Sequence, residues 1–104
     1  MPVFFDIVLG PTEPVTAPRI GQSRVEVAGG DESTLAATWR LTYPYNLTGM
    51  PAISLPCGFD RDGMPVAIQL VGRPGADAEL LRVAAAFERA RPWCDRRPDL
   101  PELG

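Results

Sequence analysis

The side chains that could attack an amide or ester bond are few in this sequence of 104 residues. They are the hydroxyls of Ser23, Ser33 and Ser54 and the thiols of Cys57 and Cys94. Each would need a neighbouring base, and neither histidine nor lysine, the usual bases, occurs in the chain. Only carboxylates are left for that task. An autonomous serine or cysteine hydrolase is therefore the least favoured function, and no catalytic residue is assigned.

The two cysteines carry no signal for a metal site. They lie in neither a CxxC nor a zinc-site spacing, and no histidine is present to complete a ligand set. We expect two ordinary thiols, no metal and no cofactor. With 13 acidic and 10 basic residues the net charge is -3, so the positive excess that binds phosphate backbones is missing. We therefore expect no nucleic-acid partner.

Length and hydropathy predict one unit without a membrane partner. No apolar run approaches the roughly 18 residues of a membrane span. The first residues, MPVFFDIVLGP, lack the charged start and the small-residue cleavage site of a secretion signal, so we expect a cytoplasmic location. We treat residues 1–104 as a single segment, either one small domain or part of a larger one.

The N-terminal part predicts one strand and a long connection. Val3–Leu9 is typical of an interior strand with both faces buried, followed by a Pro-rich turn up to residue 14. Residues 15–30 predict a surface loop with a weak extended stretch at Val25–Val27. Gly29-Gly30 could cradle an anion at a helix start, but a simple hinge is favoured.

Residues 31–43 predict a short helix. Asp31 or Ser33 can cap its start, and Pro44 would end it. Trp39 falls on the apolar side of this helix, where a position in the core is more common than a place in a pocket.

Residues 44–72 predict a turn followed by a β-hairpin. The turn contains Asn46, a residue type that most often bends or caps the backbone. Pro56 in the first strand cannot donate to the ladder and so places that strand at an edge or a bulge. The Asp-Gly pair at 62–63 leads to the strand Val66–Val71, whose two faces are both apolar and both need cover.

Residues 77–91 predict an amphipathic helix, and residues 92–104 predict an irregular tail. The apolar stripe of the helix consists of Leu80, Val83, Ala84 and Phe87. Arginines near the helix end and in the tail are expected to form a solvated face rather than an anion site. Together the elements predict an α/β fold: a small mixed sheet with a C-terminal hairpin and flanking helices.

The order of motifs from Leu41 to Arg73, LTYPYNLTGMPAISLPCGFDRDGMPVAIQLVGR, resembles the C-terminal part of enzymes of the amidase signature family. The matching positions are Thr42, Pro44, Asn46, Gly49, Pro51-Ala52, Pro56-Cys57-Gly58, Gly63, Gln69 and Gly72-Arg73-Pro74. The upstream segment Phe5–Pro14 is similar to the family's strand and Pro-Thr segment, so the resemblance spans nearly the whole chain. It implies a partial amidase-signature fold and hydrolysis of amide C–N bonds.

The catalytic machinery that the resemblance implies is absent from this sequence. In the family a serine nucleophile is activated by a second serine and a lysine in a Gly/Ser-rich central region, and this chain has neither a lysine nor such a region. We expect a C-terminal fragment or subunit of an amidase, inactive alone. It would require the missing amidase portion to act on a small-molecule amide, or would self-associate. The alternative is a non-catalytic interaction or ligand-binding module built on the same scaffold.

Three residues are candidates for substrate binding: Trp39, Thr42 and Asn46. Family members that release ammonia from glutamine often carry an acidic residue three places before the threonine matched by Thr42, and this chain has Trp39 there. The resemblance therefore favours an apolar or aromatic amide over glutamine. Three strands and two helices cannot cover a hairpin that is apolar on both faces, so we expect apolar surface to stay exposed.

Overall fold

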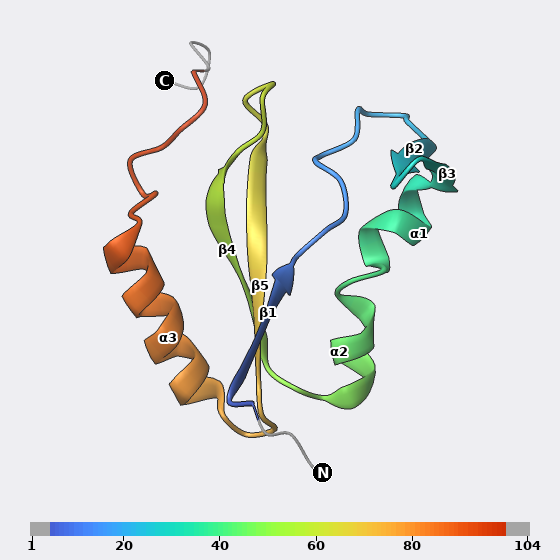
Figure 1. Ribbon diagram of the computed structural model, residues 1–104. Helices are drawn as coiled ribbons and strands as arrows, with labels where there is room; N and C mark the ends of the chain where they lie inside the picture. Colours follow the sequence, from blue (N-terminus) through green and yellow to red (C-terminus); the bar gives the residue numbers. More distant parts are fainter. Residues whose placement is uncertain (1–4, 100–104) are drawn as a thin grey trace.

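The computed structural model describes residues 5–99. Its elements are β1 (Ile7–Pro11), β2 (Arg24–Val27), β3 (Gly30–Ser33), α1 (Thr34–Trp39), α2 (Tyr43–Thr48), β4 (Ala52–Phe59), β5 (Pro65–Gly72) and α3 (Asp77–Ala90). Figure 1 shows a three-stranded sheet between α3 on one side and β2, β3, α1 and α2 on the other. We call the latter group, residues 24–48, the arm. The predicted α/β class is confirmed, and no helix within residues 5–99 is long and apolar enough to cross a membrane.

The sheet has the order β1-β5-β4, so β5 is its central strand. Both strand pairs are antiparallel, so the predicted mixed sheet is wrong in this detail, because the pairing of β1 with β5 is set by contacts that the local sequence does not specify. β4 and β5 form the predicted hairpin. Asp60 holds the connection between them, because its carboxylate accepts hydrogen bonds from the backbone N–H groups of Asp62 and Met64, both at 2.9 Å. β4 lies at an edge and is irregular between Pro56 and Gly58, as the proline predicts.

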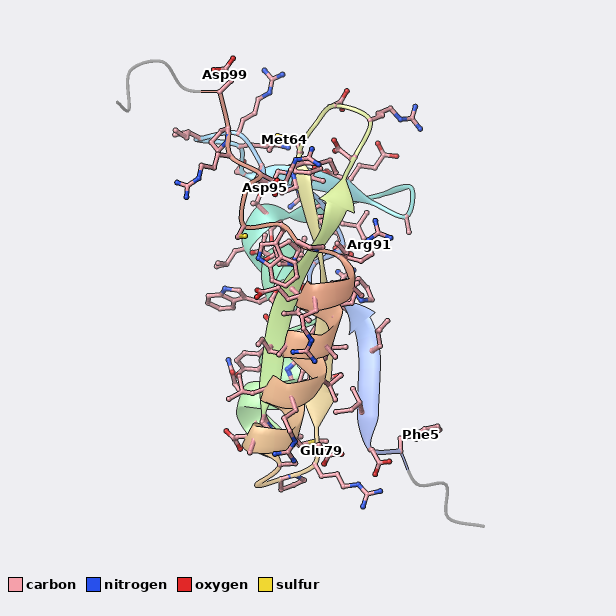
Figure 2. All side chains as sticks on the ribbon, turned by 90° about the vertical axis from the view of Figure 1, so that its left-hand side faces the viewer. Phe5, Met64, Glu79, Arg91, Asp95 and Asp99 are labelled. Atoms are coloured by element: carbon pink, nitrogen blue, oxygen red, sulfur yellow. The ribbon has the colours of Figure 1, made fainter. Side chains whose placement is uncertain are left out.

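The core lies between one face of the sheet and α3. Four side chains are buried there: Leu55, Leu70, Leu80 and Ala84. Figure 2, viewed from the α3 side, shows this helix in front of the sheet. Trp93 from the tail packs against the buried side chains, with its ring centroid 6.1 Å from that of Phe87. The apolar stripe predicted for this helix is confirmed at Leu80 and Ala84, whereas Val83 stays exposed.

β1 differs from the interior strand predicted for Val3–Leu9. It begins at Ile7 and lies at the edge of the sheet, where Val8 is 47% and Leu9 is 65% exposed. The prediction that both faces are buried is therefore wrong. An apolar run shows that a strand needs cover, but not that the same chain provides it. The first two residues of that prediction and residues 100–104 of the predicted tail lie outside the described residues.

Residues 15–30 are not a loop throughout. The extended stretch expected at Val25–Val27 is confirmed as part of β2, which pairs antiparallel with β3. The two-residue turn between them consists of Ala28 and Gly29, at φ angles of 50° and 83°. Positive φ angles at both central residues are typical of the tight turns of β-hairpins. Gly29 and Gly30 thus belong to a hairpin, and the anion cradle considered at a helix start is wrong.

The helix predicted for residues 31–43 begins later and is shorter. It starts after Ser33, whose hydroxyl accepts a hydrogen bond from the Ala36 N–H at 3.2 Å, so one of the two expected caps is confirmed. Pro44 does not end a helix but opens α2, where its missing N–H costs nothing. A continuous helix would instead bring the proline ring against the Arg40 carbonyl, which explains the break between α1 and α2.

α2 occupies residues that were predicted to form a turn. Its C-cap is Gly49, at a φ of 73°, a left-handed conformation that glycine adopts at little cost. The Gly49 N–H donates to the Tyr45 carbonyl at 3.1 Å and ends the helix. Asn46 consequently lies within a helix rather than in a turn.

Candidate functional site

Trp39, at the end of α1, is exposed. Its ring stacks on that of Tyr43 with 6.5 Å between centroids and 12° between planes, and 55% of the residue's surface stays accessible. The two rings border an open hollow of about 300 Å³, together with Ala36, Arg40 and Pro44. The core position favoured by the sequence is wrong, because Ala37 is the buried residue of α1 and the side chain two positions later points to another side of the helix.

Thr42 and Asn46 lie on a neighbouring face of the arm. Thr42 is the half-buried N-cap of α2, and its hydroxyl makes no capping hydrogen bond. Asn46 is exposed and follows four positions later, which places both residues on one side of the helix start. Neither residue borders the hollow beside Trp39. The three candidate residues therefore share the arm but not one cavity.

Gln69 joins the arm to the sheet, a role that the sequence did not reveal. It is the only buried polar side chain within residues 5–99, at 7% exposure. Its Nε2 donates to the Leu41 carbonyl at 3.0 Å, and Leu41 lies in the link between α1 and α2. The central strand thereby holds the segment that carries the candidate residues. The sequence did contain one indication of this role, because a glutamine between apolar residues of a buried strand needs a hydrogen-bond partner from another part of the chain.

The Ser54 hydroxyl, one of the possible nucleophiles, is hydrogen-bonded to another hydroxyl, that of Thr12. The Ser54 Oγ and the Thr12 Oγ1 are 2.9 Å apart, and neither neutral hydroxyl can serve as a base for the other. The half-buried Cys57 thiol donates to the Val66 carbonyl at 3.6 Å. In the described part of the chain, no hydroxyl or thiol is hydrogen-bonded to a side chain that could take its proton. Nor do three metal-ligating side chains gather anywhere within it.

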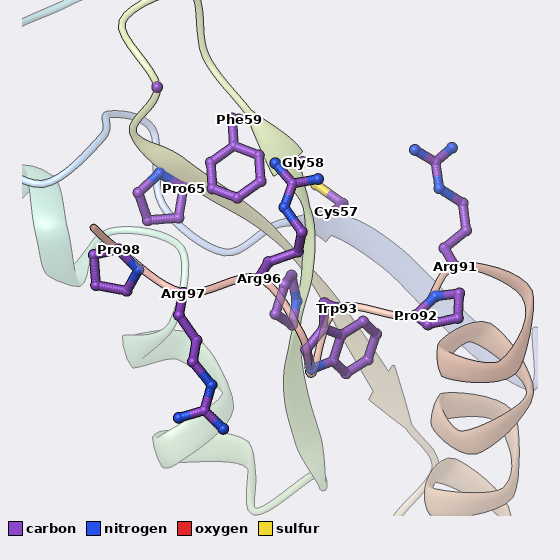
Figure 3. Close-up of a pocket in the computed structure, with 12 residues that line it drawn as sticks. Cys57, Gly58, Phe59, Pro65, Arg91, Pro92, Trp93, Arg96, Arg97 and Pro98 are labelled. Atoms are coloured by element: carbon purple, nitrogen blue, oxygen red, sulfur yellow. The ribbon is translucent and has the colours of Figure 1, made fainter. Parts of the chain in front are cut away.

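A groove of about 820 Å³ runs between the end of the β4–β5 hairpin and the tail after α3 (Figure 3). Phe59 and Trp93 give it apolar walls, and the Arg96 guanidinium lies over the Phe59 ring, 4.7 Å from its centroid. Arg91 and Arg97 also line the groove, but Figure 3 shows that they point in different directions. These arginines are exposed and do not converge, as expected for a solvated face.

Comparison with known proteins places this fold and its motifs in one family. Residues 2–81, which are more than half of the chain, match the sequence model of the family described as amidase. The chain belongs to the amidase family. The resemblance drawn from the motifs between Leu41 and Arg73 is thereby confirmed.

Two curated amidase relatives match nearly the whole chain. A Medicago truncatula protein named fatty acid amide hydrolase is 44% identical over 93 residues, which are 89% of this chain and 15% of the relative. A glutamyl-tRNA(Gln) amidotransferase subunit from Moorella thermoacetica is 43% identical over 96 residues, which are 92% of this chain and 18% of the relative. The chain thus spans less than a fifth of the length of these relatives.

Solved amidase structures contain the same arrangement. The structure of 6-aminohexanoate cyclic dimer hydrolase superimposes with a TM-score of 0.79 and 38% identity, over 91% of this chain and 21% of that one. A crystal structure of an amidase gives a TM-score of 0.77 and 35% identity, over 82% and 19% of the two chains. The sheet, α3 and the arm therefore correspond to one part of larger amidase chains.

Proposed function

We propose that this chain is the C-terminal segment of an amidase that hydrolyses an amide C–N bond, and that it does not catalyse alone. The observation that carries the proposal is the environment of Ser54, whose hydroxyl binds that of Thr12 instead of a base. The chain also lacks a lysine for the serine–serine–lysine set that the resemblance implies. The segment would contribute strands and one wall of a pocket to the rest of the enzyme.

The proposed pocket wall is the arm. Trp39, stacked on Tyr43, offers a flat apolar surface beside an open hollow. Thr42 and Asn46 offer hydrogen-bonding groups on the neighbouring face. An apolar or aromatic acyl group would bury its surface against the rings, at about 25 cal/mol per Å², while its amide binds polar groups. The absence of an acidic side chain at position 39 supports this substrate class over glutamine.

A chimera tests the proposal. The chain replaces the matching segment of the Medicago relative, and hydrolysis of benzamide and of a fatty acid amide is measured. We expect turnover by the chimera, and neither turnover nor fluorophosphonate labelling by the purified chain alone. Turnover by the chain alone that disappears in Ser54→Ala or Cys57→Ala would contradict the proposal. A folded but inactive chimera would favour the non-catalytic interaction module.

The pocket role of Trp39 is tested in the same chimera. Trp39→Asp should lower kcat/KM for benzamide about tenfold, the scale of one lost aromatic contact, and should lower it less for glutamine. Trp39→Phe keeps a ring and should retain most of the activity. Equal losses of kcat/KM in both variants would argue against a pocket role.

The expected cytoplasmic location stays a prediction, which fractionation of the source cells would test.

A further inference from the structure

Four large apolar side chains recur at every fourth position along the arm, and each is at least 50% exposed. They are Leu35, Trp39, Tyr43 and Leu47. An interval of four keeps side chains on one face within α1 and within α2. The stack of Trp39 on Tyr43 carries the row across the break between the two helices. We call this row the arm ridge.

The helices under the arm ridge carry almost no charge. Between Glu32 and Asp60 the only charged residue is Arg40, and its guanidinium is paired with Glu32. A helix that faces water normally carries charged residues on its outer side, as α3 does with five of them, counted from Asp77 to Arg89 inclusive. The composition of α1 and α2 therefore fits helices that are buried in an assembly.

The chain is more open than a compact domain of its length. The chain exposes 8051 Å², whereas a compact protein of 11.3 kDa exposes about 5,700 Å². Its Cα radius of gyration of 16.0 Å likewise exceeds the value of about 13 Å for a compact domain. Both values describe an open chain with more surface than a compact domain of this size, as expected of a segment that packs against further polypeptide.

A second copy of this chain fits that open surface poorly. A two-fold contact through the arm ridge would cover one face and leave Val8 and Leu9 exposed on the edge strand β1. A longer polypeptide can cover both the arm and the sheet edge. The relatives contain such polypeptide, because more than four-fifths of their length has no counterpart in this chain.

We infer that the two ends of the arm ridge, Leu35 and Leu47, dock against the remaining polypeptide of an amidase, the part that supplies the Gly/Ser-rich catalytic region. Trp39 and Tyr43, between these ends, form the pocket wall of the proposed function. This inference rests on the proposed function, since it names the partner that the segment requires. Leu35 and Leu47, at the two ends of the ridge, lie outside the proposed substrate pocket and become buried on docking. Their contribution to stability therefore depends on whether the partner is present.

Single substitutions in two contexts test the inference. Leu35→Ser and Leu47→Ser are made in the isolated chain and in the Medicago chimera, with Leu81→Ser as the matched control on the exposed side of α3. In the isolated chain all three should change Tm by no more than about 2 °C, because each leucine faces water. In the chimera both ridge substitutions should lower Tm by several degrees, and Leu81→Ser should not.

Several results would overturn the inference. The first is an equal change of Tm for all three substitutions in the chimera. The second is a chimera that does not fold. The third is that the isolated chain is a dimer in light scattering and that Leu47→Ser converts it to a monomer. The last result would make a second copy the occupant. Turnover is read separately: a folded chimera that depends on the ridge but lacks turnover refutes the proposed function and keeps the docking surface. An active chimera whose Tm is unchanged by both ridge substitutions refutes the docking surface and supports the proposed function.

Discussion

Replacing Gln69 with leucine should loosen the arm without unfolding the sheet. Within residues 5–99, the bond from the Gln69 Nε2 to the Leu41 carbonyl is the only hydrogen bond that joins β1, β4 or β5 to the arm. Leucine is apolar and close to glutamine in size, so the strand keeps its packing while it loses the donor. The change therefore separates attachment of the arm from the stability of the core.

The expected magnitude follows from that single bond. A neutral hydrogen bond contributes about 1 kcal/mol net, which corresponds to a factor of about five in an equilibrium constant at 25 °C. Amide hydrogens of α1 and α2 that exchange through local opening of the arm should therefore exchange about fivefold faster. The free energy of global unfolding should change by less than about 1 kcal/mol, because the leucine buries additional apolar surface.

Hydrogen exchange measured by mass spectrometry on peptides covering residues 34–48 and 77–90 distinguishes the two effects. Gln22→Leu is the matched control, because the Gln22 side chain hydrogen-bonds only to the backbone of Arg19 and Arg24 and does not join the arm to β1, β4 or β5. Unchanged exchange in residues 34–48 of the Gln69→Leu variant would refute the proposed attachment. Faster exchange in α3 as well would mean that Gln69 supports the whole fold rather than the arm.

Two further substitutions test the packing of α3 and the hairpin connection. Leu80→Ala removes a buried side chain from the core and should lower the free energy of unfolding by about 2–5 kcal/mol in urea titrations. Leu81→Ala, at a neighbour that is 61% exposed, should cost less than about 1 kcal/mol, and similar losses in the two variants would contradict the packing of α3. Asp60→Ala removes the acceptor of two backbone N–H groups and should cost about 1–2 kcal/mol. Asp62→Ala is the control, because Asp62 takes part in that connection through its backbone N–H, which alanine keeps. Equal losses of stability in the two variants would show that the Asp60 carboxylate does not hold the turn.

Elements with strong local signals were predictable from the sequence. The Asp-Gly pair at 62–63 specifies a tight connection, Pro56 excludes a central strand, and the spacing of Leu80 and Ala84 gives α3 its buried side. Each signal acts within a few residues, so no distant contact is needed to interpret it. Pro44 shows the limit of such local reasoning, because proline is compatible both with the end of one helix and with the first turn of the next.

The sequence by itself determined the amidase family and the lack of any lysine or histidine that could activate a nucleophile, because both depend only on which residues are present and in what order. Only the tertiary structure decided which groups meet. Thr12 and Ser54 are 42 positions apart, and Leu41 and Gln69 are 28 positions apart. Such contacts depend on the register of β5 with its two neighbours. The exposure of Trp39 was decided in the same way, because an aromatic ring is buried only where a packed neighbour covers it, and the periodicity of a helix does not say where that neighbour lies.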